Sequence, residues 1–148
     1  MGEQMTPGKA TQRVPRPSYG QLLEKIRYDG VYPTRRRAEE ALLAVLPVLA
    51  PQLTDQGRAL LADRLPDEVS ALLTAEASSP SRLLTNRDFV EHVAARTGTD
   101  YAVANWDTEA VLSNLASLAG PALLPRLLAQ LPAGYAALFG HAPHARAA

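Results

Sequence analysis

Histidines and carboxylates are the side chains of this sequence that metal binding or acid–base chemistry would use. His141 and His144 lie three residues apart, an interval that suits metal ligands on a helix, but Pro143 stands between them and no third ligand is near. His92 lies among apolar residues with no nucleophile in a recognisable arrangement, which favours a residue at the edge of a core over a general base. We therefore expect no metal site, no cofactor and no catalytic residue.

The carboxylates Asp63, Asp67 and Glu68 are close in sequence and resemble an acid–base pair. Asp67 and Glu68 also suit the positive N-terminus of a helix, and Asp63 is expected to face water, so a structural role is favoured. The sequence has no nucleophile elbow, phosphate-binding loop, dinucleotide fingerprint or His-Glu-x-x-His helix. These observations favour a protein that is not an enzyme.

Three consecutive arginines, Arg35, Arg36 and Arg37, are candidate contacts to an anionic partner. They belong to a basic segment, residues 1–37, with eight basic and three acidic side chains and a net charge of +5. Cations at a helix N-terminus oppose the helix dipole, so Glu39 and Glu40 one turn later are expected to offset them. Without interleaved aromatic residues the segment lacks the usual nucleic-acid footprint, which disfavours nucleic acid as the partner and favours a solvated tail with a solvated helix face.

Trp106 is the remaining candidate interaction residue. If residues 99–118 form one helix, Trp106 lies about 140° from the apolar stripe and faces outward, where an exposed tryptophan can anchor a partner. Alternatively Asp107 caps a helix and Trp106 packs on Val111 as a hydrophobic staple, or Trp106 packs within the molecule in some other way. These interpretations remain open from the sequence.

The composition of the chain indicates what class of protein carries these candidate residues. The chain has 148 residues, 47% hydrophobic and 20% charged, which is typical of one globular domain with a core. It has no cysteine, which excludes disulfides and thiol chemistry and agrees with a cytoplasmic location. Apolar stretches such as residues 41–53 are interrupted, and the N-terminus has no apolar signal segment, so we expect no membrane span.

The sequence repeats itself at an interval of sixty-six positions. Ten residues between Ala44 and Leu72 recur between Ala110 and Leu138, including the Leu65-Pro66 pair as Leu131-Pro132. The repeat predicts two tandem copies of a helical unit, about four helices each, packed as one bundle-like domain. The copies differ at three instructive places, which are Trp106 against Glu40, Asp107 against Ala41, and Ser113 against Pro47.

Turn and cap residues predict the boundaries. We expect a flexible leader over residues 1–17, a domain over 18–140 with repeats at 18–74 and 85–140, a connector over 75–81, and a frayed tail over 141–148. The caps and stops on which these boundaries depend are Ser18, Thr54 and Thr85 as N-caps, and Gly30 and Gly98 in left-handed C-terminal positions. Because of Pro47, we expect the helix there either to bend near residues 43–46 or to end and resume.

No alternating β-branched run is long enough for a sheet, so the fold class is all-α. In each predicted copy a leucine before the Leu-Pro turn points inward, and the last helix lays two apolar residues on the core. These residues are Leu65 with Leu72 and Leu73, and Leu131 with Leu138 and Phe139.

The order of these motifs resembles the bacterial domain-of-unknown-function family 2267 over about residues 18–140. The most specific match is Gln130-Leu131-Pro132 followed by Tyr135, Leu138 and Phe139. The resemblance implies an α-helical tandem fold and transfers no catalytic residue. We therefore expect a non-enzymatic interaction or scaffold module with an unknown protein partner or self-association. The alternatives are polyanion binding through residues 1–37 and an apolar-ligand carrier with a cleft between the halves.

Overall fold

The computed structural model describes residues 16–75 and 83–140, and within these ranges the chain is helical with no strand. Residues 76–81 of the expected connector, the C-terminal tail with His141 and His144, and most of the expected leader lie outside the described residues, while Ala75 ends α5. The elements are α2 (Tyr19–Gly30), α3 (Arg35–Leu49), the 3-10 turn η2 (Ala50–Gln52), α4 (Asp55–Ala62), α5 (Asp67–Ala75), α6 (Asn86–Thr97), α7 (Tyr101–Leu128) and α8 (Tyr135–Leu138). The all-α fold class is confirmed.

Side-chain caps fix where the helices begin. Ser18, Thr54 and Thr85 each accept a hydrogen bond from a backbone N–H of the first turn, and these three predicted N-caps are confirmed. Ser18 forms a full capping box, because Gln21 also accepts from the Ser18 backbone N–H. Asp100 caps α7, so the helix that carries Trp106 begins before that residue.

The end of α2 differs from the prediction. Gly98 ends α6 in the left-handed region as expected, but after α2 the left-handed residue is Val31, at φ 54°, and not Gly30. Gly30 serves another purpose, because a Cβ atom there would lie 2.3 Å from the Tyr32 ring. The ring folds back over the glycine, and the valine takes the conformation that glycine usually supplies.

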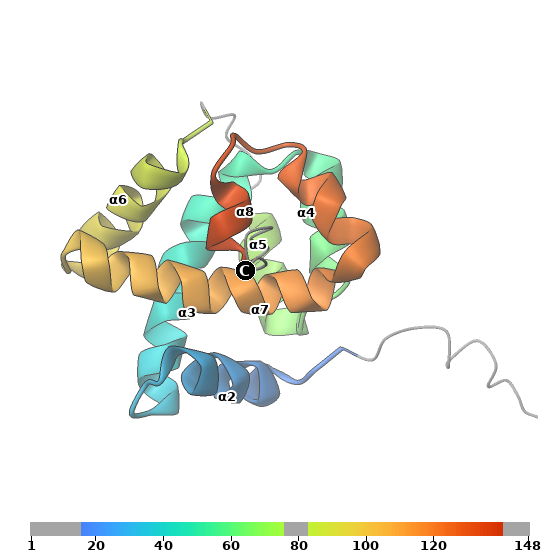
Figure 1. Cartoon of the computed structure of the whole chain (residues 1–148). Coiled ribbons are helices and arrows are strands. Elements are labelled where there is room, and N and C mark those ends of the chain that lie inside the picture. The colour runs from blue at the N-terminus through green and yellow to red at the C-terminus, as the bar shows by residue number, and fades with distance from the viewer. Residues whose placement is uncertain (1–15, 76–82, 141–148) are drawn as a thin grey trace, which may run out of the picture.

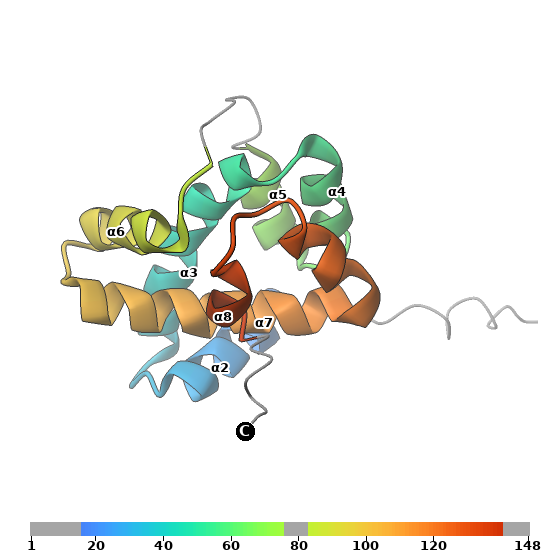
Figure 2. The ribbon, with the colours of Figure 1, turned by 45° about the horizontal axis from the view of Figure 1, so that its top comes forward.

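Two helices form the centre of the molecule. Figure 1 shows α7 running across the front with α3 crossing behind it, and Figure 2 keeps this arrangement after rotation. Helix α2 packs against both α3 and α7, and α6 packs against both from another side. Helices α2 and α6 thus both cover the central pair, whose side chains Leu42, Val45, Val111 and Leu115 are fully buried.

Proline and glycine shape the two long helices differently. Helix α3 continues through Pro47 and ends at Leu49 in the 3-10 turn η2, so the helix ends soon after this proline. In α7 the break falls at Gly120, whose φ of 79° lies outside the helical region, with Pro121 starting the next helical segment. This break turns the end of α7 back toward α4, which it contacts.

The predicted core residues are buried with one exception. Leu65, Leu73, Leu131, Leu138 and Phe139 are buried as expected. The prediction that Leu72 is buried is wrong. Leu72 is 40% exposed, because Val69 and Leu73 form the buried face of α5.

The polar groups near this core are paired as well. Tyr135 packs edge-on to Phe89 at 5.7 Å between ring centroids, and its hydroxyl donates a hydrogen bond to the Leu84 carbonyl.

In the expected leader, the Arg16 guanidinium contacts the Leu65 carbonyl and the Asp67 carboxylate, each at 3.1 Å. This part of the leader is therefore tied to the start of α5.

Among the described residues, α7 is long and apolar enough to cross a membrane by length and composition. Half of its most apolar stretch is buried inside the structure, and the core helix of a protein without a span passes the same test.

We predict that Gly30→Ala lowers the free energy of unfolding by about 2 kcal/mol, because the new methyl group overlaps the Tyr32 ring. Chemical denaturation followed by circular dichroism measures this change. Gly20→Ala in the same helix is the matched control, because its Cβ meets the flexible end of Arg35 at 3.3 Å and Ser18 Oγ at an ordinary contact distance of 4.0 Å. This control should be neutral or slightly stabilising, and equal effects of the two substitutions would contradict the ring packing.

Candidate interaction surface

A buried carboxylate joins the turn after α2 to the first half of α7. Asp107 accepts a hydrogen bond from the Tyr32 hydroxyl at 2.6 Å and two from Nη2 of Arg37, one to each carboxylate oxygen at 3.0 Å. The Arg37 guanidinium also lies 4.9 Å from the Tyr32 ring centroid, in a cation–π contact. We call these three residues the Asp107 network. It satisfies a charge that has no exposure to solvent.

Electrostatics keep the Tyr32 hydroxyl protonated. Burial raises the pKa of Tyr32 well above its ordinary value, and the hydrogen bond to Asp107 and the charge of that carboxylate raise it further. Arg37 acts in the opposite direction and is outweighed. Tyr32 is therefore a donor to Asp107 over the whole physiological pH range.

Trp106 precedes Asp107 and faces outward from α7, as the helical periodicity predicts. Its side chain is 53% exposed, while its indole Nε1 donates to the Gly30 carbonyl at 2.7 Å. The staple interpretation is wrong, since Asp107 is a buried residue inside α7 and Asp100 is the N-cap. The indole is thus fixed at its polar atom and open to solvent over much of its ring.

Two valines extend the apolar area around this indole. Val31 follows the Gly30 carbonyl and is 77% exposed, and Val103 lies one turn before Trp106 on α7 and is also exposed. Among the described residues Val31 is the non-glycine residue with positive φ, a strained conformation for a β-branched side chain. We call Val31, Val103 and Trp106 the Trp106 surface.

A surface pocket of about 390 Å³ adjoins this surface between α2, α7 and α8. Trp106, Asp29 and Glu109 are among the residues that line it. Asp29 pairs with Lys25 at 3.0 Å and accepts from Asn114 Nδ2 at 3.0 Å, so its carboxylate is held against α7. The Trp106 surface is therefore apolar with an acidic border.

The three candidate arginines point to three different partners. Arg35 pairs with Glu24 at 3.0 Å, Arg36 with Glu40 at 4.0 Å, and Arg37 with Asp107. Hydrogen bonds from Arg27 and Arg35 hold the pKa of Glu24 below its usual range. The structure does not bring the three guanidinium groups together as one anion site.

The acidic residues near these arginines take separate roles. The expected offset by Glu40 is seen, because it pairs with Arg36. Glu39 does not pair with this cluster and instead accepts from the Tyr19 hydroxyl at 2.6 Å. Of the other carboxylates, Asp67 and Glu68 occupy the first turn of α5 as expected, and Asp63 is exposed.

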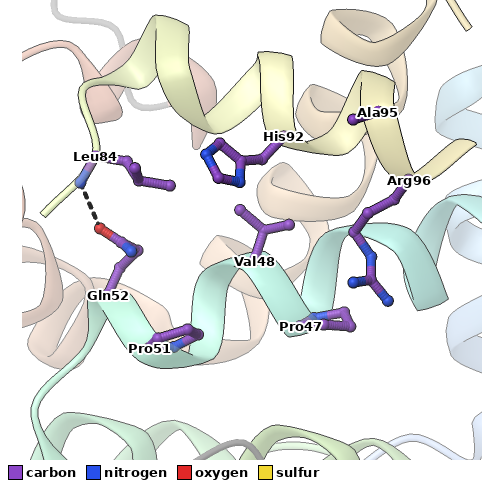
Figure 3. Close-up of a pocket in the computed structure, with 8 residues that line it drawn as sticks. All are labelled: Pro47, Val48, Pro51, Gln52, Leu84, His92, Ala95 and Arg96. Atoms are coloured by element: carbon purple, nitrogen blue, oxygen red, sulfur yellow. Dashed lines mark hydrogen bonds between the residues drawn. The ribbon is translucent and has the colours of Figure 1, made fainter. Parts of the chain in front are cut away.

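A surface groove between α3 and α6 was missed from the sequence. Its volume is about 530 Å³, and its walls come from Pro47, Val48 and Pro51 on one side and Leu84, His92 and Arg96 on the other (Figure 3). We call it the α3–α6 groove. The available signals were pairs of residues four apart, Pro47 with Pro51 and His92 with Arg96, because four residues bring side chains to one helix face.

Comparison with known proteins adds the family. A family model described as an uncharacterized conserved protein, DUF2267, matches residues 19–138, which is most of the chain. The curated proteins contain no match. Within the described residues no group of three His, Cys, Asp or Glu side chains is placed to hold a metal ion.

We predict that Asp107→Asn lowers the free energy of unfolding by about 3 kcal/mol. The amide can accept from Tyr32, but its NH₂ group then faces Arg37 donor to donor, and the guanidinium loses its carboxylate. Urea denaturation measures the change. The exposed Asp63 gives the matched control, Asp63→Asn, for which a change below about 0.5 kcal/mol is expected. A similarly small change for Asp107→Asn would show that the network adds no stability.

Alkaline pH tests the second donor of the network. Up to about pH 10, Tyr32 is protonated in both states; above that the unfolded chain loses a proton that folded Tyr32 keeps, so stability falls as pH rises. We predict that Tyr32→Phe has a shallower fall in the free energy of unfolding between about pH 10 and pH 12 than the natural protein. Other groups titrate equally in both proteins, so parallel curves would contradict the assignment.

Proposed function

This chain belongs to the DUF2267 family of uncharacterized conserved proteins, and we propose that it is a non-enzymatic interaction module whose Trp106 surface binds a protein partner. The observation that carries the proposal is the indole of Trp106, half exposed yet held by a 2.7 Å hydrogen bond to Gly30. Tryptophan is among the residues that contribute most to protein interfaces. An indole fixed before binding loses little conformational entropy when a partner covers it.

The residues behind the surface support this proposal. Asp107 fixes α7 directly after Trp106, and Tyr32 fixes the turn directly after Val31, so the Asp107 network braces both sides of the surface. Val31 keeps an exposed apolar side chain in a conformation that costs about 1 kcal/mol or more. Strain of this kind persists where the surrounding structure enforces it, and it is concentrated at functional sites.

A protein partner is preferred to a polyanion because of the arginine contacts. Arg35, Arg36 and Arg37 already pair with carboxylates of this chain, so a polyanion would have to displace Glu24, Glu40 and Asp107. Removing Arg37 from Asp107 would leave a buried carboxylate without its cation, at a cost of several kcal/mol.

We also infer that the domain arose as two copies of one helical unit. In support, α3 and α7 begin sixty-six positions apart, at Arg35 and Tyr101, and α4 begins the same distance before the Pro121 segment of α7. Helices α2 and α6 have twelve residues each. The copies differ at Trp106, Asp107 and Pro47, which lie in the Trp106 surface, the Asp107 network and the α3–α6 groove. If one copy had acquired a binding role, we would expect the two copies to differ at these positions.

The proposed setting of this module is a bacterial cytoplasm. A chain without cysteine suits a reducing compartment, since it neither needs oxidation nor risks it. Expression of a fluorescent fusion in the source cell would test this location.

We predict that a photo-crosslinking amino acid at Val103 captures one defined protein in the source cell, and that Trp106→Ala abolishes the adduct. Loss of the anchoring indole should weaken binding by about 2 kcal/mol, or roughly thirtyfold. Trp106 is the single tryptophan of the chain, so its fluorescence reports the same event in vitro. Binding of the captured protein should shift the emission to shorter wavelength.

Leu72 provides the matched control for crosslinking, because it is 40% exposed on α5 and belongs to no proposed surface. A crosslinker at Leu72 should not capture the same protein. Equal capture at both positions, or capture at Val103 that survives Trp106→Ala, would contradict the proposed surface.

A further inference from the structure

We propose that the α3–α6 groove is a second binding site, for an acidic peptide segment that also carries apolar side chains, supplied by a partner protein. The groove shares no residue with the Trp106 surface, and this inference does not rest on the function proposed for that surface. Its grounds are the shape, the apolar ridge and the charge of the groove.

The groove is held open by its own structure. In Figure 3, α6 lies above and the end of α3 with η2 lies below, and His92 projects into the space between them over Val48. At one end the Gln52 side chain, itself buried, accepts a 2.7 Å hydrogen bond from the Leu84 backbone N–H. This bond connects the segment before α6 to the end of η2 and fixes the separation of the two walls.

The α3 wall is an apolar ridge. Pro47 and Pro51 stand four residues apart, and Leu43, which is 40% exposed, continues the ridge one turn earlier. Neither proline has an N–H, and each presents its ring at the surface of this wall. The ridge therefore offers apolar contact to the side chains of a peptide.

The α6 wall supplies positive charge. Arg96 reaches from α6 toward Pro47 across the end of the groove, and His92 lies one turn earlier on the same wall. Within residues 16–75 and 83–140, Arg96 makes no ion pair, and Glu40 on α3 is already paired with Arg36. No acidic residue lines the groove in this part of the chain.

The combination selects one class of ligand. A single arginine beside an apolar ridge pairs well with one carboxylate next to apolar side chains, whereas a polyanion needs several cations along its backbone. A peptide with glutamate or aspartate between leucines fits both walls, because its carboxylate reaches Arg96 and its apolar side chains cover Pro47 and Pro51.

The test uses two short synthetic peptides with the same leucines in the same order, one carrying glutamates and the other lysines at the remaining positions. Added to the full-length, isotope-labelled protein, the glutamate peptide should shift the backbone amide signals of Gln52, Leu84 and His92, and the lysine peptide should not. Arg96→Glu should weaken glutamate-peptide binding about tenfold and improve lysine-peptide binding. Arg126→Glu, an exposed charge reversal near the far end of α7, is the matched control and should leave both affinities unchanged.

Three results would overturn the proposal. The first is equal binding of the two peptides, which would remove the role of Arg96. The second is a shift of amide signals at Trp106 and Val31 without any shift in the groove. The third is a dimer, seen by sedimentation of the free protein, whose formation shifts the groove signals, because the occupant would then be a second copy. The result with Trp106→Ala affects none of these outcomes, so the two proposals fail separately.

Discussion

The structure depends on one buried charge, the carboxylate of Asp107 inside the central helix α7. A carboxylate without solvent is stable only with nearby donors, and here they come from Tyr32 and Arg37, 75 and 70 residues earlier in the chain. Satisfying this charge fixes the turn between α2 and α3 against α7. It thereby sets where Trp106, Val31 and Gly30 lie. The geometry of the exposed Trp106 surface therefore follows from the need to pair the buried Asp107 carboxylate.

The parts of the fold that local chemistry determines were predictable from the sequence. Ser18, Thr54 and Thr85 cap helices because a hydroxyl two or three residues before a backbone N–H needs no distant partner. The buried leucines follow from helical periodicity. The end of α2 was mispredicted because Gly30 is needed to make room for the Tyr32 ring and not to supply a left-handed backbone conformation. The contact between the ring and the glycine depends on how the turn packs, which the local sequence does not specify.

The candidate site was predictable only in part, because its geometry is made by long-range contacts. Trp106 was identified by residue type and its outward direction by periodicity, but nothing in its neighbourhood indicates a bond to Gly30, 76 residues earlier. Arg37 could be grouped with Arg35 and Arg36 from adjacency, yet α3 turns each side chain to a different face and a different acid. The α3–α6 groove requires two helices at a known distance, which no single stretch of sequence specifies.

The packing of α2 and α6 against central helices from the other half of the sequence affects how the chain folds. Helix α2 contacts α7 and α6 contacts α3, so each half of the sequence completes its core with an element from the other half. Helical bundles usually fold fast because their contacts are local. Here the chain must close loops of about seventy residues before its apolar core is fully buried. We expect cooperative folding in which neither half is stable by itself. Such a chain emerging from the ribosome holds an unfinished apolar face until α7 has been synthesised.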